Sequence, residues 1–149
     1  MALVDLIEKN VIKIPMTAES KTAAIDEMIE VLVNANKISH PGAVRQAILK
    51  REDLGSTGLE NGIAVPHAKC DEVDKLILAL GISPRGIDFE AMDGNPSHLF
   101  FMILAPPDQS GPHIEALAEI AKITRSKSFY KLLITAANAE EVVELFHEE

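Results

Sequence analysis

Two uninterrupted apolar segments constrain the fold of this chain more than any other feature. Residues 75–83 read KLILALGIS, and residues 98–106 read HLFFMILAP. Neither segment alternates polar and apolar residues, so each is predicted to form a strand that is buried on both of its faces. Strands of this kind occur in sheets that are covered by helices on two sides.

Helical periodicity in the rest of the chain supplies those covering layers. The helical patterns run through residues 24–33, 44–51, 112–124, 127–136 and 138–149, and shorter strands are predicted at 11–15 and 63–65. Thr17 is predicted to cap the first helix, and Asn138 the last, with Glu141 three residues further on. The predicted class is therefore α/β, with helices on both faces of the sheet.

Composition bounds the class of protein. The chain has 149 residues, which is one domain's length, and its hydrophobic fraction of 47% suits a globular core. Its net charge of −9 argues against nucleic acid and anionic lipid as partners, and favours a partner with a basic face. With Cys70 as the one cysteine, no signal-peptide pattern at the start and no apolar run of about 20 residues, we expect a cytoplasmic protein that is not inserted in a membrane.

The segment GIAVPHAK, residues 62–69, presents the first candidate for chemistry. An apolar run ends at Pro66, and His67 follows at once. Proline limits the backbone at this point, and ligand sites in open α/β sheets lie at strand ends and in the loops after them. His67 is therefore either a functional residue or a histidine whose ring is satisfied by a backbone carbonyl beside a tight turn.

Arg51 and His113 are the second and third candidates. His113 opens a predicted helix, where free backbone N–H groups favour an anion, although it could be an ordinary first-turn residue. Arg51 ends the second predicted helix and could bind a phosphate or carboxylate through two hydrogen bonds. The alternative for Arg51 is a surface ion pair with Glu52 or Asp53.

The remaining motifs predict no further site. His40 precedes a helix, His98 begins a strand and His147 lies in the last helical turn, so none of the three is expected to act. His67 and Cys70 have a metal-like spacing, but no second cysteine pair exists and zinc is not expected. The glycine-rich loop at 55–62 is neither a Walker loop nor a dinucleotide fingerprint, and no G-x-S-x-G motif occurs.

The segment from Arg51 to Lys69, REDLGSTGLENGIAVPHAK, resembles the phosphorylation-site segment of the type-2 enzyme IIA domains of the bacterial phosphoenolpyruvate-dependent phosphotransferase system. This fructose–mannitol family includes the nitrogen-regulatory IIA proteins. GIDFEAMDGNPSHLFFMILAPP at 86–107 resembles its central region, and HIEALAEIAKI at 113–123 its following helix. The resemblance implies a single EIIA type-2 domain over residues 1–149, with a mixed sheet in a three-layer α/β/α arrangement.

The resemblance also implies roles for four residues. His67 would accept a phosphoryl group from the carrier HPr, on Nε2, and pass it on, and Arg51 and His113 would complete the pocket. Arg51 could supply charge, and His113 and Thr57 could supply hydrogen bonds to the transferred group. No metal or cofactor is needed, because the donor and the acceptor are both protein side chains.

Several functions stay open. A sugar-type protein would hand the phosphoryl group to the IIB component of a fructose- or mannitol-like permease, and residues 86–101 lean toward that side. A nitrogen-regulatory type would bind targets according to its phosphorylation state. A binding module that transfers nothing onward, and a histidine-dependent hydrolase, are the alternatives of another class.

Overall fold

The computed structural model describes residues 3–148. Its elements, in chain order, are η1 (Leu3–Leu6), η2 (Lys9–Val11), β1 (Ile12–Lys13), α1 (Lys21–Asn34), α2 (Pro41–Asp53), β2 (Ile63–Ala64), β3 (His67–Lys69), β4 (Ile77–Ile87), β5 (Ser97–Ala105), α3 (Ser110–Thr124), α4 (Lys127–Ile134) and α5 (Ala139–Glu148). The two apolar segments are the long strands β4 and β5, as predicted.

The sheet is mixed and is built around these two strands. β4 and β5 pair antiparallel, with Leu80 opposite Phe101, and β1 adds to β4 in parallel. β2 and β3 both pair in parallel with β5, one after the other along the same edge, with Ile63 opposite Leu99. Two short strands therefore share the outer edge of one long strand, and the break between them precedes His67.

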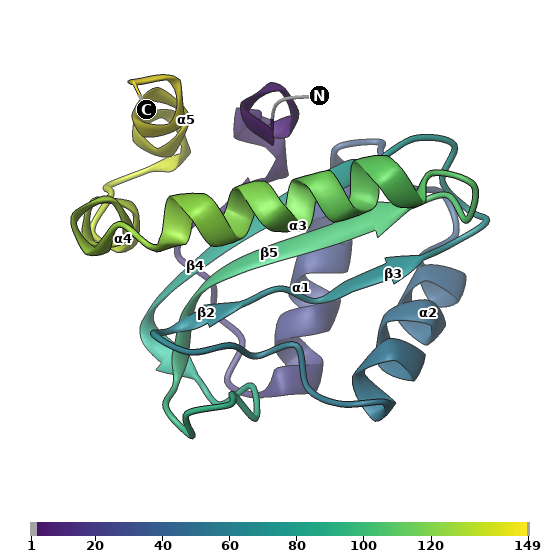
Figure 1. Cartoon of the computed structure of the whole chain (residues 1–149), viewed down its shortest axis with the longest axis horizontal. Coiled ribbons are helices and arrows are strands. Elements are labelled where there is room, and N and C mark those ends of the chain that lie inside the picture. Colours follow the sequence, from purple (N-terminus) through teal and green to yellow (C-terminus); the bar gives the residue numbers. More distant parts are fainter. Residues whose placement is uncertain (1–2, 149) are drawn as a thin grey trace.

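Side chains of β5 alternate between two apolar layers. Phe100, Met102 and Leu104 pack into a cluster with α1 and α2, whereas Leu99, Phe101 and Ile103 pack into a second cluster with α3, α4 and α5. Figure 1 shows α3 lying across one face of the sheet, with α1 on the opposite face. This arrangement confirms the predicted three-layer fold and explains why neither strand sequence alternates.

Of the two predicted helix caps, the one at Asn138 is confirmed and the one at Thr17 is wrong. Asn138 accepts the backbone N–H of Glu141 at 2.9 Å, as predicted for the start of α5. Thr17 does not cap α1: Ser20 is the N-cap, and its side chain accepts the N–H three residues on. Thr17 instead donates its N–H and hydroxyl to Glu27, because it lies too far before the helix to reach the free N–H groups of the first turn.

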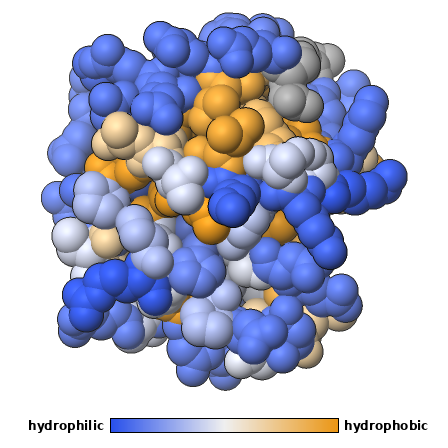
Figure 2. Space-filling model, turned by 90° about the vertical axis from the view of Figure 1, so that its left-hand side faces the viewer, coloured by the Kyte–Doolittle hydropathy of each residue, from blue (hydrophilic) through white to orange (hydrophobic). Residues whose placement is uncertain are grey.

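Hydrophilic side chains cover most of the one face that Figure 2 shows. Figure 2 shows the face at the left-hand side of Figure 1, where apolar side chains gather in the upper half, at the height of α4 and α5. Across residues 3–148, no helix combines the length and the apolar character that crossing a bilayer requires.

Candidate functional site

The backbone around His67 is set by the interruption between β2 and β3. Pro66 has no N–H and cannot donate to the ladder, but its carbonyl accepts the N–H of Ile103 at 3.0 Å and keeps the segment on the edge of β5. The expectation that His67 lies beyond a strand end is corrected by this pairing. His67 is the first residue of β3, opposite Ile103.

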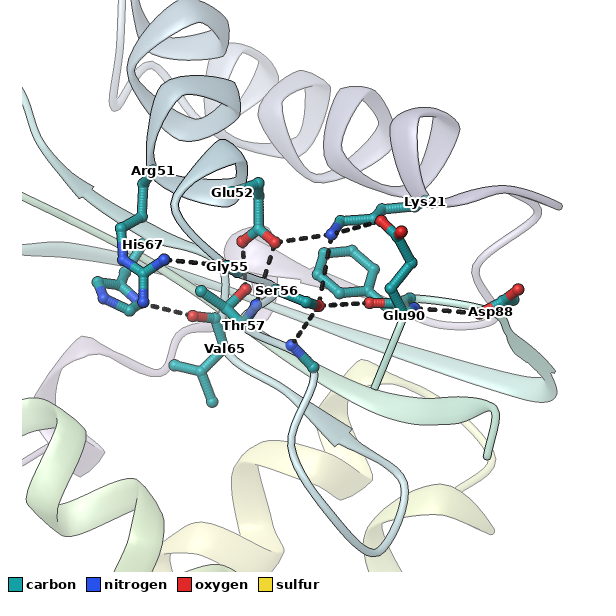
Figure 3. Close-up of polar contacts among 12 residues, drawn as sticks. Lys21, Arg51, Glu52, Gly55, Ser56, Thr57, Val65, His67, Asp88 and Glu90 are labelled. Carbon is teal, nitrogen blue, oxygen red and sulfur yellow. Dashed lines mark hydrogen bonds and ion pairs between the residues drawn. The ribbon is translucent and has the colours of Figure 1, made fainter. Parts of the chain in front are cut away.

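One ring nitrogen of His67 is engaged with the backbone. Nδ1 lies 2.7 Å from the carbonyl oxygen of Val65, as Figure 3 shows. A carbonyl can only accept, so Nδ1 carries the hydrogen, and in the neutral imidazole Nε2 then holds the free lone pair. A backbone-satisfied histidine and a reactive histidine, which the sequence presents as alternatives, are therefore compatible in the same ring.

His113 lies next to His67. It is the fourth residue of α3, which begins at Ser110, two residues before the predicted start, and the two ring centroids are 5.2 Å apart in an edge-on arrangement. Its ring is buried, and among residues 3–148 no group forms a hydrogen bond with its buried Nε2. Burial first, and then the charges of His67 and Lys69, hold the pKa of His113 below its ordinary value of 6.5. A buried, uncharged imidazole with an unused nitrogen is thus placed beside the candidate nucleophile.

Arg51 approaches the same point from the last turn of α2. Its Nη1 donates to the carbonyl of Gly55 at 2.8 Å, and Figure 3 shows its guanidinium beside the His67 ring. Within residues 3–148, no ion pair joins Arg51 to Glu52 or Asp53, so the alternative of a surface ion pair is not formed. The Glu52 side chain is buried instead.

These three side chains line one cavity of about 520 Å³. The other lining residues are Ala47, Lys50, Leu54, Ala68 and Lys69. Arginine and lysine are the only charged types in this lining, although the whole chain carries a net charge of −9. The cationic lining of this cavity therefore suits an anionic group beside His67.

Lys69 was missed in the sequence interpretation. It lies two residues after His67 in β3, and its Nζ donates to the hydroxyl of Ser110, the first residue of α3, at 2.6 Å. Residues two apart in a strand point to the same face, so a strand assignment for 67–69 would have brought Lys69 into the site. The signal was hidden because the sequence was interpreted as a loop after a strand.

Thr57 does not line the cavity but bonds Glu52, the residue that follows Arg51 in the chain. Its backbone N–H and its hydroxyl both donate to the carboxylate of Glu52, and its carbonyl accepts the N–H of Val65 at 3.0 Å. Both donors of Thr57 are therefore already used, and direct hydrogen bonding to a transferred group would require breaking one of them.

The other histidines lie outside this cavity. His40 contacts Glu72 at 2.9 Å, and Nδ1 of His98 lies 2.9 Å from the carbonyl of Ser83. His147 is exposed near the end of α5. In the part of the chain that the structure describes, no group of three or more His, Cys, Asp and Glu residues is arranged to hold a metal ion.

Comparison with known proteins identifies relatives over nearly the full length. The family model described as phosphoenolpyruvate-dependent sugar phosphotransferase system, EIIA 2, matches residues 5–149. The PTS system fructose-specific EIIABC component of Bacillus subtilis (strain 168) is 36% identical over 148 residues, which are 99% of this chain but only 23% of that protein. A nitrogen regulatory protein of Bradyrhizobium diazoefficiens is 32% identical over 142 residues, which are 95% of this chain and 92% of that protein.

Solved structures confirm the fold. Nitrogen regulatory protein IIA-Ntr from Neisseria meningitidis superposes with a TM-score of 0.87 at 31% identity, over 96% of this chain and 97% of that one. IIA mannitol from Escherichia coli gives a TM-score of 0.80 at 27% identity, over 93% and 96% of the two chains. A complex of IIA mannitol with phosphorylated IIB mannitol from Escherichia coli gives 0.81 at 26% identity, over 95% and 97%.

Proposed function

Since this chain belongs to the EIIA 2 family of the phosphoenolpyruvate-dependent sugar phosphotransferase system, we propose that it is a phosphocarrier with His67 as the phosphorylated residue. In this proposal residues 1–149 act as one EIIA type-2 domain in the cytoplasm. The phosphoryl donor is an HPr-type carrier, and the acceptor is a IIB component in fructose- or mannitol-like uptake.

The observation that carries the proposal is the hydrogen bond from Nδ1 of His67 to the Val65 carbonyl. It leaves the lone pair of Nε2 directed away from the backbone and available to attack phosphorus. As the new N–P bond forms at Nε2, the N–P bond of the donor phosphohistidine breaks, and its electron pair returns to the donor ring. The Val65 carbonyl meanwhile stabilises the proton that stays on Nδ1 while the phosphorylated ring carries more positive charge.

The neighbouring side chains support the charge on the transferred group. Phosphoryl transfer requires in-line positioning and stabilisation of the equatorial oxygens. The guanidinium of Arg51 has five N–H donors, of which the bond to Gly55 uses one, and Lys69 adds a second cation at the same cavity. The unpartnered Nε2 of His113 gains a hydrogen-bond partner when a phosphoryl oxygen enters. Thr57 acts on the turn that follows Arg51 rather than on the phosphoryl group.

The test is phosphorylation by the purified general components. The protein is incubated with phosphoenolpyruvate, enzyme I and HPr, and acid-labile phosphate is measured on it. The wild type should be labelled and His67→Ala should not, whereas His40→Ala, an exposed histidine outside the cavity, should be labelled as the wild type is. Absence of label on the wild type, or full label on His67→Ala, would refute the proposal.

A regulatory role is the second candidate. It is favoured by the similarity to a nitrogen regulatory protein, which is 32% identical to this chain over 142 residues. The phosphorylated protein is therefore offered to a fructose-type and a mannitol-type IIB. Transfer of the label supports the uptake role and excludes a pure binding module. Retention of the label, together with a target captured only in one phosphorylation state, supports regulation.

A further inference from the structure

A buried carboxylate lies directly behind the candidate site. Glu52 follows Arg51 in the last turn of α2, and its side chain is only 5% exposed. Three donors converge on it: the Nζ of Lys21 at 2.9 Å, the backbone N–H of Thr57 at 3.1 Å and the hydroxyl of Thr57 (Figure 3). A carboxylate this deeply buried is stable only when it is paired and hydrogen-bonded, and here it is both.

Lys21 neutralises this carboxylate from another element. It is the first residue of α1, its side chain is 17% exposed, and its ammonium lies 4.9 Å from the centre of the Phe89 ring. Burial alone would lower the pKa of Lys21, but hydrogen bonds to Glu52 and Glu90 raise it above its ordinary value. Glu90 is 73% exposed, so Glu52 is the partner that water screens less.

The Glu52 carboxylate closes the loop on which Arg51 depends. The two bonds from Thr57 clamp the turn from Glu52 to Thr57, and the N–H of Gly55 adds a bond to the Glu52 carbonyl at 3.0 Å. Inside this turn the carbonyl of Gly55 faces the guanidinium of Arg51 and accepts from it. The position of that carbonyl, and with it the orientation of Arg51, follows from the clamp.

The same clamp leads to His67. The carbonyl of Thr57 accepts the N–H of Val65, and the carbonyl of that same Val65 accepts Nδ1–H of His67. Val65 is therefore held by Thr57 through its N–H and orients the histidine through its carbonyl, and the other bonds of Thr57 go to Glu52. One buried carboxylate therefore holds, through Thr57 and the backbone beside it, the segments that bond the proposed nucleophile on one side and the proposed cation on the other.

We propose that Lys21 and Glu52 are positioning residues, which hold His67 in its Nδ1–H tautomer and Arg51 against the cavity. The inference rests on the proposed function for the reaction that is positioned. Neither residue lines the cavity. Without Lys21 the carboxylate of Glu52 is left buried and unpaired, and it regains a partner only by taking a proton or by moving toward water. Either change makes Glu52 a weaker acceptor for the two hydrogen bonds that Thr57 donates, and the turn between the two residues loosens.

The first test uses the protein without phosphate. Nitrogen-15 resonances of His67, measured by NMR, distinguish Nδ1–H from Nε2–H. We expect the wild type to show the Nδ1–H tautomer and Lys21→Met to show a mixture of the two. Lys37→Met is the matched control, because Lys37 pairs with Glu8 at 3.1 Å on another part of the surface, and it should keep the wild-type tautomer.

The second test measures the initial rate of phosphorylation by phospho-HPr. Residues that orient a reacting group through one intermediate typically contribute about 10- to 100-fold, so Lys21→Met should be slower by at least about tenfold. Lys21→Arg should restore most of the rate. The loss should not add to that of Arg51→Ala, because Lys21 acts partly through Arg51.

Several outcomes would overturn the inference. One is a folded Lys21→Met protein with the wild-type tautomer, and another is a loss of rate that adds fully to that of Arg51→Ala. If Lys21→Met does not fold, Lys21→Met combined with Glu52→Gln removes both charges and carries the same expectations. If neither the single nor the double variant folds, Lys21 and Glu52 are needed for stability and the positioning role is rejected. A wild type that takes no phosphate would refute the proposed function. The tautomer measurement would still decide whether Lys21 and Glu52 orient His67.

Discussion

Gly62 offers a sharp test of how the backbone that leads to His67 is held. It lies just before β2 with φ of +80°, a region that other L-residues rarely adopt. Its carbonyl accepts the hydroxyl of Tyr130, from α4, at 3.2 Å. A Cβ added at Gly62 would overlap that hydroxyl and would lie 3.2 Å from Cζ of the same ring.

The magnitude for Gly62→Ala has two parts. Holding alanine in the left-handed region costs about 1 to 2 kcal/mol, and displacing the hydroxyl costs about 1 kcal/mol for its hydrogen bond. We therefore expect the free energy of unfolding to fall by about 2 to 3 kcal/mol. Gly42→Ala is the control: Gly42 is the second residue of α2, no other group lies near its missing Cβ, and the change should raise stability by about 0.5 to 1 kcal/mol.

Urea unfolding, with linear extrapolation, measures these changes. Tyr130→Phe removes the hydroxyl, so the double variant Gly62→Ala with Tyr130→Phe should lose less stability than the sum of the two single changes. The contact with the ring carbon remains, and the relief is partial. A Gly62→Ala protein as stable as the wild type, or a double variant with fully additive losses, would refute the reasoning.

Three further predictions concern the site and one helix end. Arg51→Lys should slow phosphorylation of His67 by phospho-HPr about 10²-fold, because a single ammonium cannot bond a loop carbonyl and a phosphoryl oxygen in the geometry of a guanidinium; Arg45→Lys, on the exposed side of α2, should keep the wild-type rate. The pKa of His113 is lowered in the folded state, first by burial and then by nearby positive charge. Because the unfolded chain binds the proton more readily, the free energy of unfolding should fall as pH drops below about 6.5. Urea midpoints from about pH 7.5 to 5 should show this fall in the wild type and a smaller one in His113→Gln. Asn138→Ala removes the side-chain oxygen that caps α5 and should cost about 1 kcal/mol in the same assay, whereas no loss would show that the cap does not contribute.

The central strands could be predicted because burial leaves a direct mark on sequence. Both faces of β4 and β5 contact apolar clusters, and an unbroken apolar run is what such a position requires. The edge strands left a weaker mark. β2 has two residues and β3 has three, so neither provides enough positions for a period-2 pattern. Pro66 between them indicates the end of a strand, whereas the chain continues along the same edge of β5 after it.

The tautomer of His67 could not be derived from the residues alone. It depends on the direction of the Val65 carbonyl, which lies between the Val65 N–H, bonded to the Thr57 carbonyl, and the Pro66 carbonyl, paired with β5. These are contacts between segments that sequence patterns do not join. The resemblance to the IIA family indicated Nε2 as the reactive nitrogen, and the structure supplies a physical reason for it.

Glu52 shows where a signal was present and was not used. Val44 and Ile48 form the buried stripe of α2, and Glu52 is the next position at a spacing of four, so the helix itself directs this carboxylate into the interior. A charge at a stripe position requires a buried partner of opposite sign, which argues against the surface pairing with Arg51 that adjacency suggests. The identity of that partner could not follow from the helix. Lys21 lies 31 positions earlier, at the start of α1, and only the packing of α1 against α2 on one face of the sheet brings the two charges together. The sequence thus indicates that Arg51 has a buried acidic neighbour, and the tertiary fold determines what that neighbour holds in place.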